Sequence, residues 1–75
     1  MKVNKMNIGI LSDNLNTWNH LISIDNPTYI PRTEEQIRLR DMKKGFVVYV
    51  VRRVMSTFYS ANDIQIDIDV TKLAN

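Results

Sequence analysis

A chain of 75 residues without cysteine and with a single histidine has no disulfide, no zinc–thiolate site and no multi-histidine metal site. Its formal net charge of +2 and apolar fraction of 44% are typical of a globular domain, and no apolar run is long enough for a membrane-spanning helix. We therefore expect one cytoplasmic domain over residues 1–75, without a cofactor. A second subunit would supply the stability that so small a core lacks.

The first part of the chain predicts a β-hairpin. Met6, Ile8 and Ile10 occupy alternate positions, which is the period of a half-buried strand. Turn-forming residues follow, and apolar and polar residues then alternate again over residues 18–24. A short helix over residues 14–22 also fits the apolar spacing there, but the alternation favours the hairpin.

The next segment predicts a connector followed by the start of a helix. Pro27 and Pro31 interrupt regular structure over residues 25–32. Thr33 and Gln36 then match a capping box, in which each side chain accepts a hydrogen bond from the free backbone N–H of the other residue. A helix is therefore expected to begin at Thr33.

This helix is expected to run to about residue 60, either bent at Gly45 or with its first half extending beyond the core. Both options arise because charged residues in the first half lie on the same side of the helix that is apolar in the second half. The alternative is a buried strand over FVVYVV, residues 46–51, since valine and aromatic residues favour sheets. The helix is preferred because the segment RRVMSTFYSA continues the helical spacing.

The end of the chain predicts a strand over residues 63–70, in which isoleucine and valine alternate with acidic or amide residues. The acidic positions would form a solvated face. The complete pattern is β-β-α-β. It predicts an α+β fold in which one long helix covers one face of a small antiparallel sheet.

The sequence offers little for catalysis, and we predict that the protein is not an enzyme. Ser12 and Ser23 lie near His20, but a nucleophilic serine also needs an orienting acid and an oxyanion site. Asp67 and Asp69 would lie about 7 Å apart on one strand face, where carboxylates could bind a divalent cation. An ordinary amphipathic strand is the preferred explanation, because they alternate with isoleucines and no calcium-loop pattern surrounds them. No metal site is predicted.

Two charged groups are candidates for binding a partner. Residues 32–61 hold seven basic and three acidic residues, a sum of +4, whereas residues 62–75 sum to −2. The basic group could neutralise nucleic-acid phosphates, with Trp18 and Tyr49 stacking on unpaired bases. The acidic group could dock onto a basic, DNA-binding surface of another protein. For each group the alternative is a solvated face. The basic residues are Arg38, Arg40, Lys43, Lys44, Arg52 and Arg53, and the acidic residues are Asp63, Asp67, Asp69, Glu34 and Glu35.

Three apolar residues of the predicted helix, Ile37, Leu39 and Met42, lack an obvious core face. They are candidates for the contact of a homodimer. The alternative is that they cover the edge of the sheet.

In its length, its lack of cysteine and its content of Asn, Ile and Lys, the chain resembles the short early proteins with which bacteriophages of low-GC hosts inhibit host machinery. Within this group it is similar to the sliding-clamp inhibitors of staphylococcal phages. Gln36-Ile37-Arg38-Leu39 begins like a clamp-binding peptide, although Arg40 and Asp41 follow where that peptide carries aromatic residues.

The resemblance implies a homodimer in the host cytoplasm that takes part in host takeover. Such a protein binds a host DNA-replication or transcription protein, for example the DNA polymerase sliding clamp, and blocks its loading onto DNA. The alternative function, inferred from the basic group, is a small DNA- or RNA-binding regulator that uses a basic helix over residues 38–53.

Overall fold

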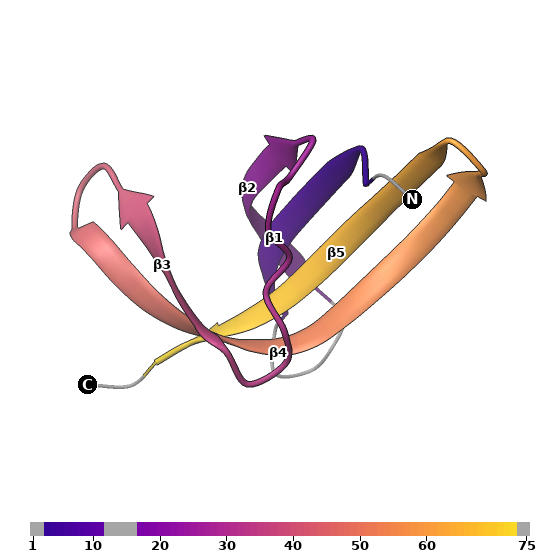
Figure 1. Cartoon of the computed structure of the whole chain (residues 1–75). Coiled ribbons are helices and arrows are strands. Elements are labelled where there is room, and N and C mark those ends of the chain that lie inside the picture. Colours follow the sequence, from indigo (N-terminus) through magenta and orange to yellow (C-terminus); the bar gives the residue numbers. More distant parts are fainter. Residues whose placement is uncertain (1–2, 12–16, 74–75) are drawn as a thin grey trace.

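The computed structural model describes residues 3–11 and 17–73, which form one five-stranded sheet and contain no helix (Figure 1). The sheet order is β2-β1-β5-β4-β3; β1 and β5 are parallel and all other neighbours are antiparallel. The strands are β1 (Lys5–Leu11), β2 (Trp18–Asp25), β3 (Gln36–Asp41), β4 (Gly45–Ser60) and β5 (Asp63–Lys72). The predicted α+β fold is therefore wrong: the protein is all-β, and the sheet curls into a half-barrel.

The N-terminal hairpin and the last strand confirm the sequence prediction. β1 and β2 pair in antiparallel register, with Met6 opposite Ile24. The strand predicted over residues 63–70 is β5, which lies at the centre of the sheet between β1 and β4. The alternative helix over residues 14–22 is wrong for residues 18–22, which belong to β2, and its residues 14–16 lie outside the described part of the chain.

The long helix predicted from Thr33 to about residue 60 is wrong, because this segment forms β3 and β4. The capping box is not used: Thr33 lies in a turn, and Gln36 lies in β3 opposite Val50. Between them, Glu34 has a φ of 73°, a left-handed conformation that does not occur inside a right-handed helix. The alternative strand over FVVYVV is correct, since the sheet preference of valine and aromatic residues outweighs the helical spacing of the following residues.

Gly45 ends a hairpin turn and does not bend a helix. Asp41 is opposite Gly45 in the register, so three residues form the loop between β3 and β4. The Oδ1 atom of Asp41 accepts hydrogen bonds from the backbone N–H groups of Lys43 (2.8 Å) and Lys44 (3.2 Å). Gly45 has a φ of +82°, the left-handed conformation with which three-residue hairpin loops commonly end.

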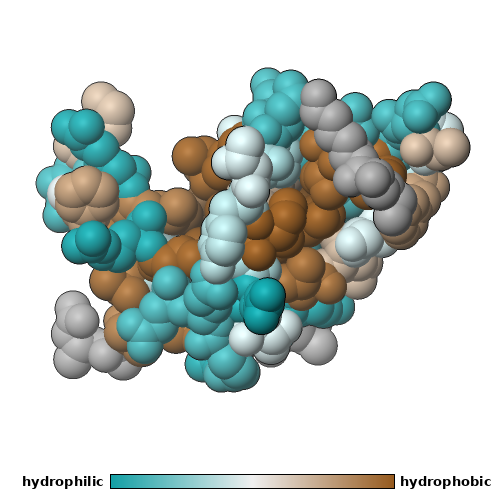
Figure 2. Space-filling view, viewed as in Figure 1, coloured by the Kyte–Doolittle hydropathy of each residue, from teal (hydrophilic) through white to brown (hydrophobic). Residues whose placement is uncertain are grey.

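The core lies on the face of the sheet that carries the isoleucines of β5, called here the inner face; the opposite, outer face carries Asp67 and Asp69. Fully buried apolar side chains contribute about 1.5–3 kcal/mol each to folding. The connector between β2 and β3 covers this face, since Pro31 is buried and Ile30 packs against the core. Figure 2 shows apolar atoms gathered between the β3–β4 hairpin and the β1–β2 side of the molecule. The core cluster consists of Met6, Ile8, Tyr49, Val51, Ile66, Ile68 and Val70.

A bulge in β4 separates two parts of that strand. The register of β4 against β5 shifts between Val51 and Arg53, and such an irregularity bends a strand and increases its twist. On the N-terminal side of the bulge, β4 lies between β3 and β5; on the C-terminal side its sheet partner is β5.

Candidate functional site

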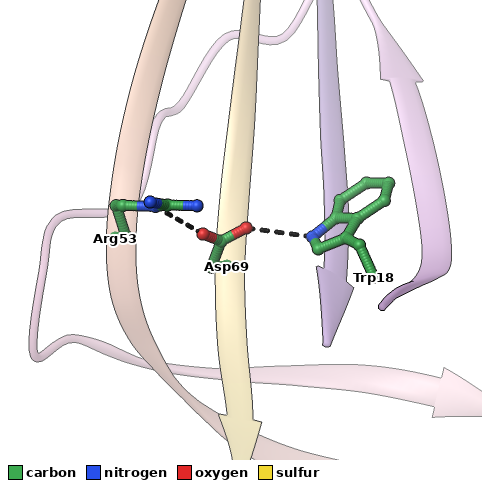
Figure 3. Close-up of polar contacts among 3 residues, drawn as sticks. All are labelled: Trp18, Arg53 and Asp69. Atoms are coloured by element: carbon green, nitrogen blue, oxygen red, sulfur yellow. Dashed lines mark hydrogen bonds and ion pairs between the residues drawn. The ribbon is translucent and has the colours of Figure 1, made fainter. Parts of the chain in front are cut away.

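On the outer face, the carboxylate of Asp69 joins side chains from two other strands. Its Oδ1 accepts a hydrogen bond of 2.9 Å from Nε1 of Trp18 in β2, and its Oδ2 accepts one of 2.6 Å from Nε of Arg53 in β4 (Figure 3). Asp69 is 4% exposed, and both of its oxygens have partners. Hydrogen bonds to a charged group are stronger than neutral ones, so this group fixes the orientation of the indole and the guanidinium.

Gly9 allows Trp18 to reach Asp69 across β1. Gly9 lies beside Asp69 in the parallel register of β1 and β5. A Cβ atom on Gly9 would overlap the indole carbons Cε2 and Cζ2 of Trp18. The indole therefore lies against the backbone of β1, and its other neighbour is His20, whose ring packs edge-on with the centroids 5.9 Å apart.

Beside these residues lies an open hollow of about 270 Å³, called here the Trp18 hollow. Trp18 remains 37% exposed, and the side chain of Arg53 is 55% exposed. An exposed indole can stack on a planar ring, and the fork of an arginine can bind a phosphate or a base edge. The hollow is lined by Leu11, Trp18, Arg53, Met55, Asp67 and Asp69.

A second set of polar contacts crosses the outer face next to the hollow. Nε2 of His20 and Oγ of Ser23 are 2.6 Å apart; Oγ of Ser23 donates to Oδ1 of Asn7 (2.7 Å), and Nδ2 of Asn7 donates to Oδ1 of Asp67 (3.1 Å). Asp67 thus bonds to Asn7 and not to His20. The acid does not orient the imidazole, so these residues do not have the arrangement of a serine–histidine–aspartate triad.

The β3–β4 hairpin exposes most of the predicted basic residues. Arg38 and Arg40 are opposite Val48 and Phe46, which lie on the same face of β4 as Val50. Val50 is opposite Thr71 on the outer face of β5, so Arg38 and Arg40 also point to the outer face. The guanidinium of Arg38 lies 5.7 Å from the ring centroid of Phe46, a cation–π contact. Phe46 itself is 66% exposed. We call this surface the hairpin patch: Arg38, Arg40, Lys43, Lys44 and Phe46.

The charge of the hairpin patch is not neutralised locally. Asp41 is the only acidic residue between Gln36 and Val50, so the four basic residues leave a net charge of +3. Its carboxylate is directed to the turn: hydrogen bonds from the backbone N–H groups of Lys43 and then Lys44 lower the pKa of Asp41 below its usual 3.8. The basic side chains are exposed.

Arg52 and Arg53 connect the hairpin patch with the Trp18 hollow. Nε of Arg52 donates to Oγ1 of Thr71 (3.0 Å), which lies on the outer face of β5 next to Asp69. Arg52 also forms an exposed ion pair with Glu34 (3.5 Å). The predicted basic helix does not exist. Its six basic residues lie instead in β3, in the β3–β4 turn and in β4.

The predicted acidic residues do not form one exposed row, although Asp67 and Asp69 share the outer face of β5. Asp69 is buried and ion-paired, Asp67 is bonded to Asn7, and Asp63 is exposed at the start of β5. Glu34 and Glu35 lie in the connector. Glu35 accepts a hydrogen bond from the hydroxyl of Tyr29, and this bond is the main cause that raises the Tyr29 pKa above 10.0.

The three residues predicted for an apolar dimer contact also do not lie on one surface. Ile37 and Leu39 point to the inner face and pack against the core, whereas Met42 is 99% exposed in the hairpin loop. Tyr49 was expected to stack on bases together with Trp18, but it is 8% exposed and belongs to the core. Only Trp18 of this pair is accessible to a base.

Sequence reasoning did not find the link between Trp18 and Asp69, which are 51 residues apart. The one local signal was Gly9, because an isolated glycine within a strand pattern indicates a close approach of other atoms to the backbone. That signal points to a contact, but it does not name the partner.

Comparison with protein-family models, with curated proteins and with solved structures gives no match for this chain. The resemblance to phage inhibitors therefore stays a prediction. Among residues 3–11 and 17–73 there is no cluster of three or more histidine or acidic side chains that could hold a metal ion. The same residues contain no helix with the length and hydropathy needed to cross a membrane.

Proposed function

We propose that this protein is a non-enzymatic, single-stranded nucleic-acid-binding protein that uses the outer face of its sheet. The observation that carries the proposal is that the hairpin patch and the Trp18 hollow share this face and are joined by Arg52 and Arg53. The ligand's sugar–phosphate backbone would follow the basic residues, and a base would enter the hollow.

The charge of the hairpin patch suits a polyanion. Basic side chains that neutralise phosphates release condensed counterions, which provides a driving force without sequence preference. The exposed patch offers Arg38, Arg40, Lys43 and Lys44, while Asp41 and Asp69 are occupied by internal hydrogen bonds. These two acids therefore do not present free carboxylates to the ligand.

The Trp18 hollow favours an unpaired base over a paired one. A base within a duplex has both faces covered by its neighbours, whereas a single strand can present a free face to the indole. Base–aromatic stacking contributes about 1–3 kcal/mol per base. Arg53, held by Asp69 beside the indole, could bind the edge of the same base or its phosphate.

The inhibitor function inferred from the sequence depends on an acidic docking surface. The acidic residues proposed for it are dispersed over β5 and the connector, and four of the five have internal partners: Asp67, Asp69, Glu34 and Glu35. Binding to a host protein stays a prediction, and it is the competing outcome of the experiment below.

The test is binding of labelled single-stranded DNA, single-stranded RNA and duplex DNA, measured by fluorescence anisotropy over a salt series. We expect the single strands to bind more tightly, with affinity falling as salt rises. Trp18 is the only tryptophan, so stacking should also quench the intrinsic fluorescence.

The matched variants are Arg40→Glu and, as a control with the same change in net charge, Arg32→Glu in the connector, outside the patch. Arg40→Glu should weaken binding strongly and the control should weaken it only slightly. Absence of binding by the wild type at low salt would overturn the proposal, and capture of a host protein by that same preparation would support the inhibitor function.

A further inference from the structure

The C-terminal half of β4 is a free edge of the sheet within the described part of the chain. β3 pairs with β4 as far as Val50, and the connector bonds to Val51, whose N–H donates to the carbonyl of Glu35 (2.9 Å) and whose carbonyl accepts from Glu34 (2.8 Å). Beyond the bulge, β5 is the partner on one side only. Figure 1 shows this half of β4 at the border of the sheet.

The register identifies which backbone groups are free. The carbonyl of Ile64 accepts a hydrogen bond from the N–H of Asn4, next to β1. Because the backbone groups of successive residues alternate in direction along a strand, even-numbered residues of β5 direct theirs to β1 and odd-numbered residues direct theirs to β4. The residues opposite those odd-numbered positions are Arg53, Met55 and Thr57. By alternation, the N–H and C=O groups of Val54, Ser56 and Phe58 point away from β5, to the free edge.

This edge lacks the usual protection against pairing with another strand. Exposed edges commonly carry lysine, proline or inward-pointing charges. Residues 54–62 contain no charged residue and no proline. They expose apolar side chains instead: Met55 is 45% exposed, Phe58 59% and Tyr59 65%.

We infer that a second copy of this chain pairs with the edge, antiparallel and about a twofold axis perpendicular to the sheet. Such an axis keeps equivalent faces on one side, so residues of the same parity must be opposite. Ser56 would face Ser56 of the second copy, and Val54 would face Phe58. No like charges are then opposite, and β-branched and aromatic side chains meet, which stabilises strand pairs.

A register centred on Thr57 also has the correct parity, but it fits the side chains less well. It would place Ser56 opposite Phe58 and Val54 opposite the irregular end of the strand after Phe58, so that both apolar side chains of the inner face lose their apolar partner. The centre at Ser56 is therefore the one we propose.

The dimer would join two sheets into one and leave both outer faces on the same side. The two hairpin patches and the two Trp18 hollows would then face a single ligand strand together. The pairing depends only on the β4 edge, so the dimer can be tested independently of nucleic-acid binding.

Cysteine cross-linking tests the register directly, because the chain has no cysteine of its own. Residues opposite one another in a hydrogen-bonded antiparallel pair have Cα atoms about 5.5 Å apart, which a disulfide can span, whereas diagonal positions are about 7–8 Å apart. Under mild oxidation Ser56→Cys should form a covalent dimer much faster than Thr57→Cys. Faster cross-linking of Thr57→Cys would overturn the proposed register.

Sedimentation velocity over a wide concentration range tests the dimer without cross-linking. The wild type should dimerise, and Ser56→Lys, which places two lysines opposite each other at an exposed position, should raise the dissociation constant several-fold, most at low salt. Thr57→Lys is the control, because Met55 would face it. A wild type that stays monomeric at every concentration, or equal effects of the two lysines, would overturn the inference.

Discussion

The indole of Trp18 lies against the backbone of Gly9 and hydrogen-bonds to Asp69 on the far side of that strand. One side chain of β2 thus crosses β1 to reach β5. The ion pair of Asp69 with Arg53 extends the link to β4. Four of the five strands are connected on the outer face, on the side of the sheet that the apolar core does not occupy.

Gly9→Ala should displace the indole of Trp18. The added methyl group has no space, and because backbone of β2 also lies close to it, relaxation has to move the side chain or separate the strands. Overpacking of this kind costs about 1–3 kcal/mol. We expect a lower free energy of unfolding in urea, together with red-shifted and more readily quenched tryptophan emission. Emission identical to that of the wild type would show that the indole does not lie against Gly9.

Asp69→Ala should destabilise the protein more than Asp69→Asn. The amide of asparagine keeps one oxygen that can accept from Trp18, but its NH2 group replaces the oxygen that accepts from Arg53, so the ion pair and its hydrogen bond are lost; alanine removes both interactions. Because Arg53 is half exposed, solvent screens the ion pair, and we expect about 1 kcal/mol for asparagine and about 2–3 kcal/mol for alanine. Urea denaturation of both variants checks this order; equal losses would contradict the two-sided role of the carboxylate.

The salt dependence of single-strand binding should report the residues of the hairpin patch. If Arg40 neutralises one phosphate, Arg40→Ala should reduce the slope of log Kobs against log salt by about 0.7. Arg32→Ala in the connector should leave the slope unchanged. Anisotropy titrations at several salt concentrations measure both, and an equal change in the two variants would indicate a general charge effect.

Acidification should loosen the β3–β4 turn through Asp41. Its pKa is lowered in the folded protein by the backbone N–H groups of Lys43 and Lys44, so the carboxylate stabilises the folded state at pH values above its ordinary pKa of 3.8. This contribution is lost as pH falls through the lowered folded pKa. In NMR titrations the two amide resonances should shift together in acid, and Asp41→Asn should abolish that shift. A shift centred above pH 3.8 would contradict the lowered pKa.

The strands that could be predicted from the sequence are those with a single clear period. Ile64, Ile66 and Ile68 alternate with acidic or amide residues, and only a strand directs the first set to one face and the second set to the other. Residues 33–60 fit two patterns at once. The alternation of Ile37 and Leu39 indicates a strand, but Thr33 and Gln36 imitate a helix start, and the helix interpretation hid the turn at Gly45.

The candidate site was predicted only in part, and for a physical reason. Basic residues gather on a surface whether their segment is a helix or a hairpin, because their charge keeps them in water. The pairing of Asp69 with Trp18 depends on the order of the strands, which no local pattern encodes. The same holds for Asp67, whose carboxylate accepts from Asn7, 60 residues away in the sequence.

Gly45 and Gly9 should respond to alanine for opposite reasons, and this contrast tests the hairpin. A Cβ atom on Gly45 meets no atom within 4 Å, so Gly45→Ala creates no clash. Its φ of +82° is nevertheless costly for a residue with a Cβ, and we expect a loss of about 1–2 kcal/mol. Asparagine tolerates left-handed backbone better, so Gly45→Asn should lose less, and D-alanine introduced by chemical synthesis should lose least. Urea denaturation ranks the three variants. A loss for D-alanine as large as that for L-alanine would mean that position 45 does not hold the left-handed conformation on which the hairpin patch depends.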